Sequence, residues 1–268
     1  MNFRVLFLGD VVGKPGRRIV RQRVPLLRSE LKADIIIANA ENASGGIGLT
    51  AKNARELLDS GIDLLTSGNH IWKHRDIGQY MDKNPDRIVR PLNYPPGAPG
   101  YGMARIERPN VPVLYVINLL GRTFMDDVDC PFLTADKVLK SLPPQSSVLI
   151  DFHAEATSEK KALAYYFLGK AGAVLGTHTH VQTNDARIIG KKTGFITDAG
   201  MCGPYDSVLG MEPREVVHKF TTARPARFKT ASGPAELNAV VIDFDSDSGT
   251  CLNIFTWKEN ELEEANNV

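Results

Sequence analysis

The chain has 268 residues, of which 43% are hydrophobic and 24% charged, and its 32 basic and 31 acidic residues leave a net charge of +1. This balance is typical of an ordinary globular protein and argues against a protein that coats long nucleic acid or membrane surfaces. No apolar run approaches membrane-spanning length. We predict a single domain over residues 1–268, and three scattered cysteines without an apolar leader favour the cytoplasm.

Strands and helices are predicted to alternate along the first half of the chain. Short apolar runs that end at polar or glycine residues indicate buried strands, and amphipathic stretches between them indicate helices. Thr50 is expected to cap one helix with its hydroxyl. The predicted elements are strands at 3–8, 34–38 and 63–66, helices at 15–31, 51–60 and 73–81, and an irregular loop at 91–100.

The second half is predicted to begin and end with antiparallel hairpins. Thr157 or Ser158 is expected to cap a helix between buried strands. This pattern predicts the α/β class, and the polar tail after Lys258 is expected to fray. The predicted elements are hairpins at 103–107 with 111–118 and at 237–243 with 251–257, strands at 148–152, 173–175 and 194–197, and helices at 157–168 and 212–220.

Two histidines, His178 and His180, follow an apolar run that Gly176 interrupts. Side chains two residues apart leave the same face of an extended backbone, so both imidazoles can reach one point. Neutral imidazole is a common ligand of zinc, iron, manganese and nickel. A lone His-x-His is more often a polar turn, so the metal interpretation depends on further ligands elsewhere in the chain.

Polar residues also stand directly after other apolar strands. Ligands of α/β folds bind at the carboxyl edge of the sheet, so these side chains are expected to meet there. Burying many polar groups in one crevice is costly unless something binds them, and two metal ions that share a carboxylate would do so. The candidate residues are Asp10, Glu41, Asn42, Asn69, His70, His153, His178 and His180.

Taken together, these segments resemble the calcineurin-like metallophosphoesterases, and more closely the YmdB-like branch of that superfamily. The resemblance runs from Asp10 to about Phe220, and the set of motifs is specific although each motif alone is weak. The motifs are Gly9-Asp10, Ala40-Glu41-Asn42, Gly68-Asn69-His70, the segments 118–124 and 151–160, Gly176 to His180, and Gly203 to Asp206.

The resemblance implies a four-layer α/β/β/α sandwich with two metal ions per chain, iron or manganese. It also implies phosphodiesterase activity on cyclic nucleotides, 2′,3′-cyclic ones first and 3′,5′-cyclic ones as a further class. His70 would stand beside the leaving group. By position, the first metal would take Asp10, Glu41, Asn42 and His180, and the second would take Glu41, Asn69, His153 and His178, with Glu41 bridging.

The sequence departs from the wider superfamily at three positions. Val12 stands where a histidine ligand is usual, and Asn42 is the expected substitute. Glu41 stands where the bridging residue is usually aspartate. Ile71 replaces the acid that often follows the motif histidine, which leaves the group that orients His70 undefined.

The implied mechanism follows from charge. A phosphodiester anion resists attack, and coordination to metal lowers the pKa of water from 15.7 to about 7, so that hydroxide between the ions can act as nucleophile. The ions would neutralise charge on the phosphoryl oxygens, and His70 would protonate the departing alkoxide. Two alternatives stay open: a phosphomonoesterase acting on nucleotides or sugar phosphates, and a regulatory protein that binds a nucleotide or an RNA end.

Arg122 is a weaker candidate for substrate binding. A guanidinium can hold a phosphate through two hydrogen bonds, but a surface ion pair is the slightly better explanation of this residue. The expected partner is a small cyclic phosphodiester. Neither a membrane nor a long nucleic acid is expected, and a homo-oligomer is compatible with the sequence.

Overall fold

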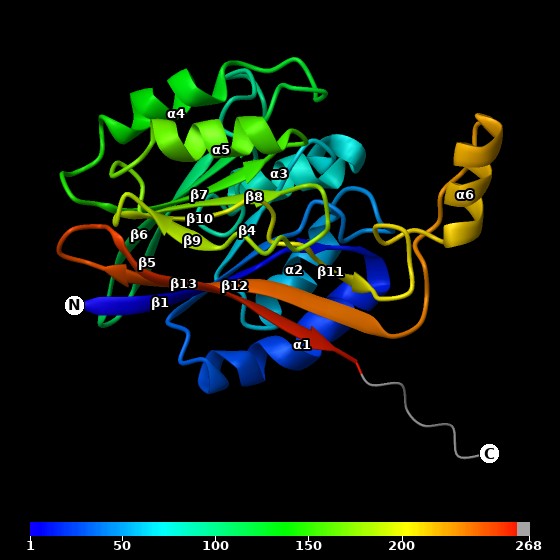
Figure 1. Ribbon diagram of the computed structural model, residues 1–268, viewed down its shortest axis with the longest axis horizontal. Helices are drawn as coiled ribbons and strands as arrows, with labels where there is room; N and C mark the ends of the chain where they lie inside the picture. Colours follow the sequence, from blue (N-terminus) through cyan, green and yellow to red (C-terminus); the bar gives the residue numbers. More distant parts are fainter. Residues whose placement is uncertain (262–268) are drawn as a thin grey trace.

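The computed structural model describes residues 1–261. Within this range two β-sheets pack face to face, and helices cover their outer faces, as Figure 1 shows. This is the predicted four-layer α/β/β/α sandwich. Most of the tail that was expected to fray, residues 262–268, lies outside the described residues, and the last strand continues to Asn260, further than predicted.

The first sheet contains seven strands among residues 1–261. They are β1 (Asn2–Leu8), β2 (Asp10–Val11), β3 (Ile35–Asn39), β4 (Leu64–Thr66), β11 (Met201–Pro204), β12 (Ala235–Asp245) and β13 (Cys251–Asn260). Their order is β2-β11-β12-β1-β3-β4, with β13 paired to β12. Because β1, β3 and β4 run parallel, their carboxyl ends lie at the same edge of the sheet.

The second sheet contains six strands in the same part of the chain. They are β5 (Met103–Arg108), β6 (Val111–Leu120), β7 (Ser147–His153), β8 (Ala173–Thr177), β9 (Arg187–Ile189) and β10 (Thr193–Ile196). Their order is β5-β6-β7-β8-β10-β9. The inner four are parallel and both edge strands are antiparallel, so the inner strands also end at one edge.

The helices lie on the outer faces, with one exception. The shared apolar cores place α1 (Gly13–Glu30), α2 (Ala51–Asp59) and α3 (Asp76–Lys83) on the first sheet, and α4 (Pro131–Leu139) and α5 (Thr157–Tyr166) on the second. Helix α6 (Pro213–Thr222) stands away from the sandwich, at the right of Figure 1. None of the helices in residues 1–261 is both long enough and apolar enough to cross a membrane.

Most helices match the predictions, and their ends account for the differences. Thr50 caps α2 as expected, since its hydroxyl accepts from the Asn53 amide at 3.2 Å. The predicted cap at Thr157 or Ser158 is wrong, because Ala156 occupies the cap position of α5 without a side-chain hydrogen bond. The single helix predicted over 73–81 is divided into a 3-10 turn, η1 (Ile71–Lys73), and α3, because His74 between them has an extended backbone.

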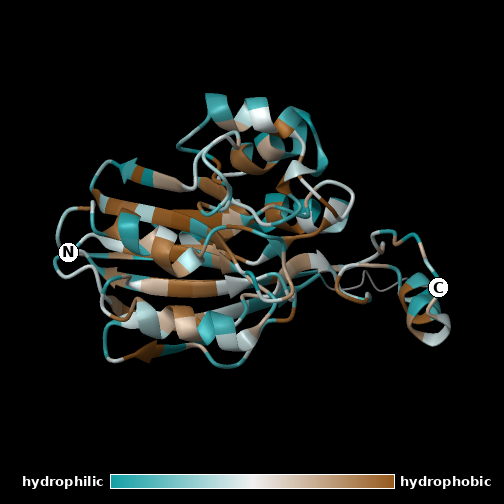
Figure 2. Cartoon of the chain, turned by 90° about the horizontal axis from the view of Figure 1, so that it is seen from above, coloured by the Kyte–Doolittle hydropathy of each residue, from teal (hydrophilic) through white to brown (hydrophobic). Residues whose placement is uncertain are grey.

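Strand β1 shows how the sequence builds the layers. Its alternate side chains face opposite sides of the sheet. Val5 and Phe7 lie in the core between the two sheets, whereas Leu6 and Leu8 lie in the core beneath α1, α2 and α3. A third core packs α4 and α5 against the second sheet. Figure 2 shows the strands as largely hydrophobic and the outer helices as partly hydrophilic, as their positions inside and outside the sandwich require.

Candidate metal centre

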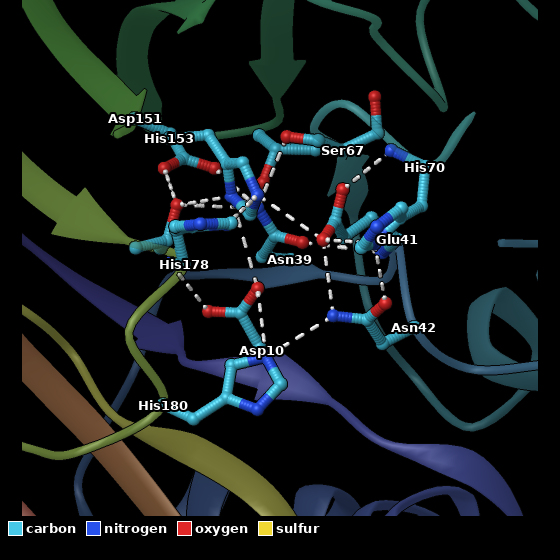
Figure 3. A network of polar contacts seen from close by, with 12 residues as sticks. Asp10, Asn39, Glu41, Asn42, Ser67, His70, Asp151, His153, His178 and His180 are labelled. Carbon is cyan, nitrogen blue, oxygen red and sulfur yellow. Dashed lines mark hydrogen bonds and ion pairs between the residues drawn. The ribbon is translucent and has the colours of Figure 1, made fainter. Parts of the chain in front are cut away.

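Glu41 lies at the centre of a group of polar side chains at the carboxyl edge of both sheets (Figure 3). It is fully buried. Its Oε1 atom lies 3.1 Å from His153 Nε2 and 3.1 Å from His70 Nδ1. Asn42 Nδ2 donates to the same oxygen at 3.0 Å. Gly68 permits this approach, because a Cβ atom there would overlap both Glu41 Oε2 and His153 Nε2.

A buried relay of hydrogen bonds fixes the ring of His153. His153 ends β7 and is paired in register with Thr177, which ends β8. His153 Nδ1 lies 2.9 Å from Thr177 Oγ1, which donates to Asp151 Oδ1 at 2.7 Å. Asn39 Nδ2 donates to the other oxygen of Asp151 at 3.0 Å. Because Nδ1 is engaged in this way, Nε2 is the nitrogen that faces Glu41 and can ligate a metal.

The prediction that His178 and His180 share an extended strand is wrong. Strand β8 ends at Thr177, and both histidines have a left-handed backbone, with φ of 101° and 64°. Their side chains nevertheless reach the site. His178 Nδ1 lies 3.1 Å from His153 Nε2. His180 Nε2 lies 3.1 Å from Asn42 Nδ2.

In each of these two imidazoles, the ring nitrogen that points away from the cluster also has a partner. His178 Nε2 lies 3.2 Å from Glu155 Oε2, and His180 Nδ1 donates to the carbonyl of Leu209 at 3.0 Å. A partner on one ring nitrogen fixes the tautomer and leaves the other nitrogen for a metal. Both histidines therefore present one nitrogen to the cluster.

The residues present fit a bound metal ion. Ligand atoms of Glu41, His153 and His178 lie within 4.8 Å of one another. An ion with nitrogen ligands at about 2 Å would hold such atoms about 3 Å apart. Two further oxygens, Asp10 Oδ1 and Asn69 Oδ1, are buried and have no hydrogen-bond partner among the described residues. A cation beside them would remove the cost of burying them unpaired.

The group that orients His70, which the sequence leaves undefined, is the pair Glu41 and Asn42. The backbone amide of His70 donates to Glu41 Oε2 at 3.0 Å. Its ring Nδ1 lies 3.1 Å from Asn42 Oδ1, in addition to the contact with Glu41 Oε1. Both neighbours are acceptors, so Nδ1 carries a proton and Nε2 takes no part in these contacts.

Burial and charge pairs compete in setting the pKa values of this cluster. Burial alone would lower the pKa of His153, but the carboxylates of Glu41, Asp10 and Asp151 raise it to about 9. Burial would raise the pKa of Glu41, but His153 and His70 hold it well below its usual range. The pKa of His178 falls to about 3 because it is buried beside His153. Burial raises the pKa of Asp10.

A cavity opens over the cluster. Its lining consists of Glu41, Asn42, Gly46, His70, Glu155, His178, Thr179, His180, Leu209 and Met211. Arg122 is exposed and does not belong to this lining, and its backbone amide donates to Glu159 Oε1 at 3.0 Å. The role of Arg122 in substrate binding stays a prediction.

The sequence analysis assigned no role to three residues that support the site, Asp151, Thr177 and Glu155, although all three lie in the quoted motifs. Asp151 stands two residues before His153 in the same strand, so the period of two was a usable signal that both side chains share a face. Thr177 had no such signal, because its contact with His153 depends on the pairing of β7 with β8. Glu155 lies beyond the end of β7, where only the fold determines its direction.

Comparison with known proteins identifies the family. The sequence model of the YmdB-like protein family matches residues 6–256. The chain belongs to this family. It is 48% identical to a Bacillus subtilis protein named 2′,3′-cyclic-nucleotide 2′-phosphodiesterase, over 94% of this chain and 95% of that protein. The resemblance predicted from the motifs is therefore confirmed.

Two solved structures share the fold of this YmdB-like protein. A hypothetical protein from Thermus thermophilus has a TM-score of 0.91 and 42% identity, covering 97% of this chain and 100% of its own. A protein described as a novel phosphatase from Mycoplasma pneumoniae also has a TM-score of 0.91, with 33% identity, covering 97% of this chain and 94% of its own. The predicted fold is confirmed, and the names of the relatives agree with a hydrolase of phosphoric esters.

Proposed function

We propose that this YmdB-like protein is a phosphodiesterase that hydrolyses 2′,3′-cyclic nucleotides with two bound metal ions. The observation that carries the proposal is the convergence of carboxylate, amide and imidazole groups around Glu41. In addition, the predicted ligands Asp10 and Asn69 each have a buried oxygen without a hydrogen-bond partner among residues 1–261. The name of the Bacillus subtilis relative supports the substrate class. The 3′,5′-cyclic nucleotides contain the same kind of phosphodiester and are included in the proposal.

Two sets of side chains would hold the metals. Oxygen and nitrogen donors without a thiolate favour iron or manganese over a structural zinc. The ions would supply charge neutralisation for the phosphoryl oxygens and a water of lowered pKa. Asp10, Glu41, Asn42 and His180 would form one set, and Glu41, Asn69, His153 and His178 the other.

The orientation of the Asn42 side-chain amide determines whether its oxygen can bind the first metal. Its nitrogen faces His180 and its oxygen faces His70. Ligation through the oxygen therefore requires the amide to turn over. Replacing Asn42 by aspartate would offer an oxygen in either orientation, so we expect Asn42→Asp to retain metal, whereas Asn42→Ala should weaken metal binding.

His70 is the proposed proton donor. Its side chain is 35% exposed and lines the cavity, whereas Glu41 beneath it is completely buried. Glu41 Oε1 accepts from Nδ1, which leaves Nε2 as the nitrogen that can give a proton to a departing alkoxide. Leu209 and Met211 also line the cavity, and their apolar side chains suit the base of a nucleotide.

The test compares substrates over one preparation of purified protein, stripped of metal by a chelator and reloaded with iron or manganese. Rates are measured with 2′,3′-cyclic AMP, 3′,5′-cyclic AMP and 5′-AMP. The proposal requires metal-dependent hydrolysis with the cyclic substrates ahead of 5′-AMP, and loss of activity in His178→Ala. His218→Ala is the matched control, because His218 is exposed on α6.

Faster turnover of 5′-AMP would favour a phosphomonoesterase. Tight nucleotide binding without any hydrolysis would favour a regulatory protein.

A further inference from the structure

Two buried charged residues form an ion pair behind the turn that carries His178 and His180. Lys160 Nζ lies 2.8 Å from Asp198 Oδ2, and the two side chains are 1% and 0% exposed. Lys160 belongs to α5, and Asp198 follows β10. Neither residue lines the cavity. Removing two charges from water is costly, so this pair is not explained by stability alone.

The carboxylate of Asp198 holds the residue between the two histidines. Thr179 donates to Asp198 Oδ2 from its backbone amide at 3.0 Å and from its hydroxyl at 2.7 Å. The other oxygen, Oδ1, accepts from the amide of Gly200 at 2.8 Å. The carboxylate of Asp198 therefore accepts four hydrogen bonds, one from Lys160, two from Thr179 and one from Gly200. Two carboxylate oxygens together offer about four acceptor sites, so all of them are used.

The backbone of the turn requires such support. His178 and His180 both have a positive φ, which is unfavourable for residues with a side chain and persists only where the surroundings determine it. Asp198 fixes Thr179 at the middle of the turn. It also fixes the far end, since its carbonyl accepts from the Thr183 amide at 3.1 Å and its amide donates to Thr183 Oγ1 at 3.0 Å.

Close packing brings Lys160 within reach of this anchor. A Cβ atom on Gly176, at the end of β8, would collide with the carbonyl of Thr197 and lie 2.9 Å from Lys160 Cδ. The glycine therefore allows β8 to lie directly against residues 197 and 198, with the lysine stem packed alongside. Gly176, which precedes the two histidines, is therefore needed for the close contact of β8 with Thr197 and Lys160.

We propose that Lys160 and Asp198 are positioning residues that hold His178 and His180 in the orientation that binds metal. Asp198 anchors the turn through Thr179, and Lys160 balances the buried charge so that Asp198 accepts all of its donors. The inference rests on the proposed function in one respect: His178 and His180 are taken to bind a metal. It concerns groups that touch neither metal nor substrate.

The experiment measures manganese affinity, the melting temperature of the metal-free protein, and hydrogen exchange of the amides in residues 177–183. Thr179→Val removes one hydrogen bond to Asp198 and keeps the shape and both charges. Lys160→Met leaves the carboxylate without its partner, and Lys160→Met with Asp198→Asn removes both charges. Lys170→Met is the matched control, because Lys170 pairs with Asp136 at 3.0 Å on the surface, away from the turn.

We expect Thr179→Val to bind manganese about tenfold more weakly and Lys160→Met about 10- to 100-fold more weakly, the scale of losing an outer partner of a metal ligand. Amides of the turn should exchange faster in both variants. The double variant should bind manganese more tightly than Lys160→Met, since no unpaired charge is left. Lys170→Met should change neither affinity nor exchange.

The two proposals fail in different ways. If Thr179→Val and Lys160→Met both match Lys170→Met in manganese affinity and in exchange of residues 177–183, the positioning role is wrong. If the wild-type protein binds manganese but hydrolyses no phosphodiester, the proposed function is wrong, while weaker metal binding in these variants still supports the anchor. Should Lys160→Met not fold, Thr179→Val and the double variant decide the question.

Discussion

His153 Nε2 lies 3.1 Å from His178 Nδ1, so two imidazole nitrogens face each other at hydrogen-bond distance. One of them must carry the proton. The pKa of His153, raised to about 9 by nearby carboxylates, and that of His178, lowered to about 3 by burial, assign the proton to His153. Because Nδ1 of His153 is held by Thr177, the proton at Nε2 occupies the position that a metal ion would take.

Metal binding is therefore expected to release a proton and to depend on pH. Below a pH of about 9 the metal-free His153 holds a proton that the metal must displace, so affinity should rise as the pH increases towards 9. With one proton released, the apparent association constant should increase up to about tenfold per pH unit. Calorimetric titration with manganese in two buffers of different ionisation enthalpy at pH 7 measures the release. Identical heats in both buffers would contradict the prediction.

The relay from His153 to Asp151 makes a second prediction. Thr177→Val removes the hydroxyl that links the two residues and leaves a buried carboxylate oxygen without one donor. We expect metal affinity to fall about 10- to 100-fold and the free energy of unfolding to fall by about 1–3 kcal/mol.

Thr193→Val is the control for the relay. Thr193 is also buried in the second sheet, and its hydroxyl donates to the carbonyl of Ala171 at 2.7 Å, away from the site. Chemical denaturation should show a similar loss of stability in both variants, and only Thr177→Val should lose metal affinity. Equal affinities would show that the relay does not orient His153.

The sequence was sufficient to predict ten of the thirteen strands in residues 1–261 and the polar residues that follow several of them, but not the short strands β2, β9 and β11. Buried runs such as 148–152 have a strong apolar pattern, and parallel strands deliver their ends to one edge, so Glu41 and His153 could be expected to meet. The direction of His178 and His180 could not be predicted in the same way. Their left-handed turn is held by Asp198. This residue directly follows the predicted strand 194–197, but its hydrogen bonds to Thr179 arise only from the fold.

Other differences have the same physical origin. Helix α4 was not predicted, although Pro131 stands at its first turn. It has nine residues like α2, but Cys130 before it makes no side-chain cap, and the helix is stabilised by packing on the second sheet. The orientation of His70 by Glu41 and Asn42 also required the fold, since these residues lie on segments that only the sheet brings together. The local sequence pattern predicts helices and strands, whereas the orientation of the site residues depends on contacts between them.

His70→Ala tests the proton donor. The variant should retain metal, because His70 is not among the proposed ligands, and it should lose about 10²- to 10⁴-fold in turnover of 2′,3′-cyclic AMP. A p-nitrophenyl phosphodiester has a leaving group that needs no protonation, so its turnover should fall much less. Metal analysis and both rates are measured on the same preparation. If metal content is lost, or both substrates slow equally, His70 has another role.

Gly68→Ala tests whether the metal centre depends on the close approach of Glu41 and His153. The added methyl group would overlap Glu41 Oε2 and the ring of His153, both of which are completely buried and cannot move aside freely. We expect metal content and activity to be lost, with a fall in stability of about 1–3 kcal/mol from overpacking. Gly97→Ala is the matched control, since a methyl group there meets no atom within 4 Å. Metal analysis and thermal unfolding of both variants decide the matter, because retention of metal by Gly68→Ala would mean that the cluster tolerates a wider spacing than its contacts indicate.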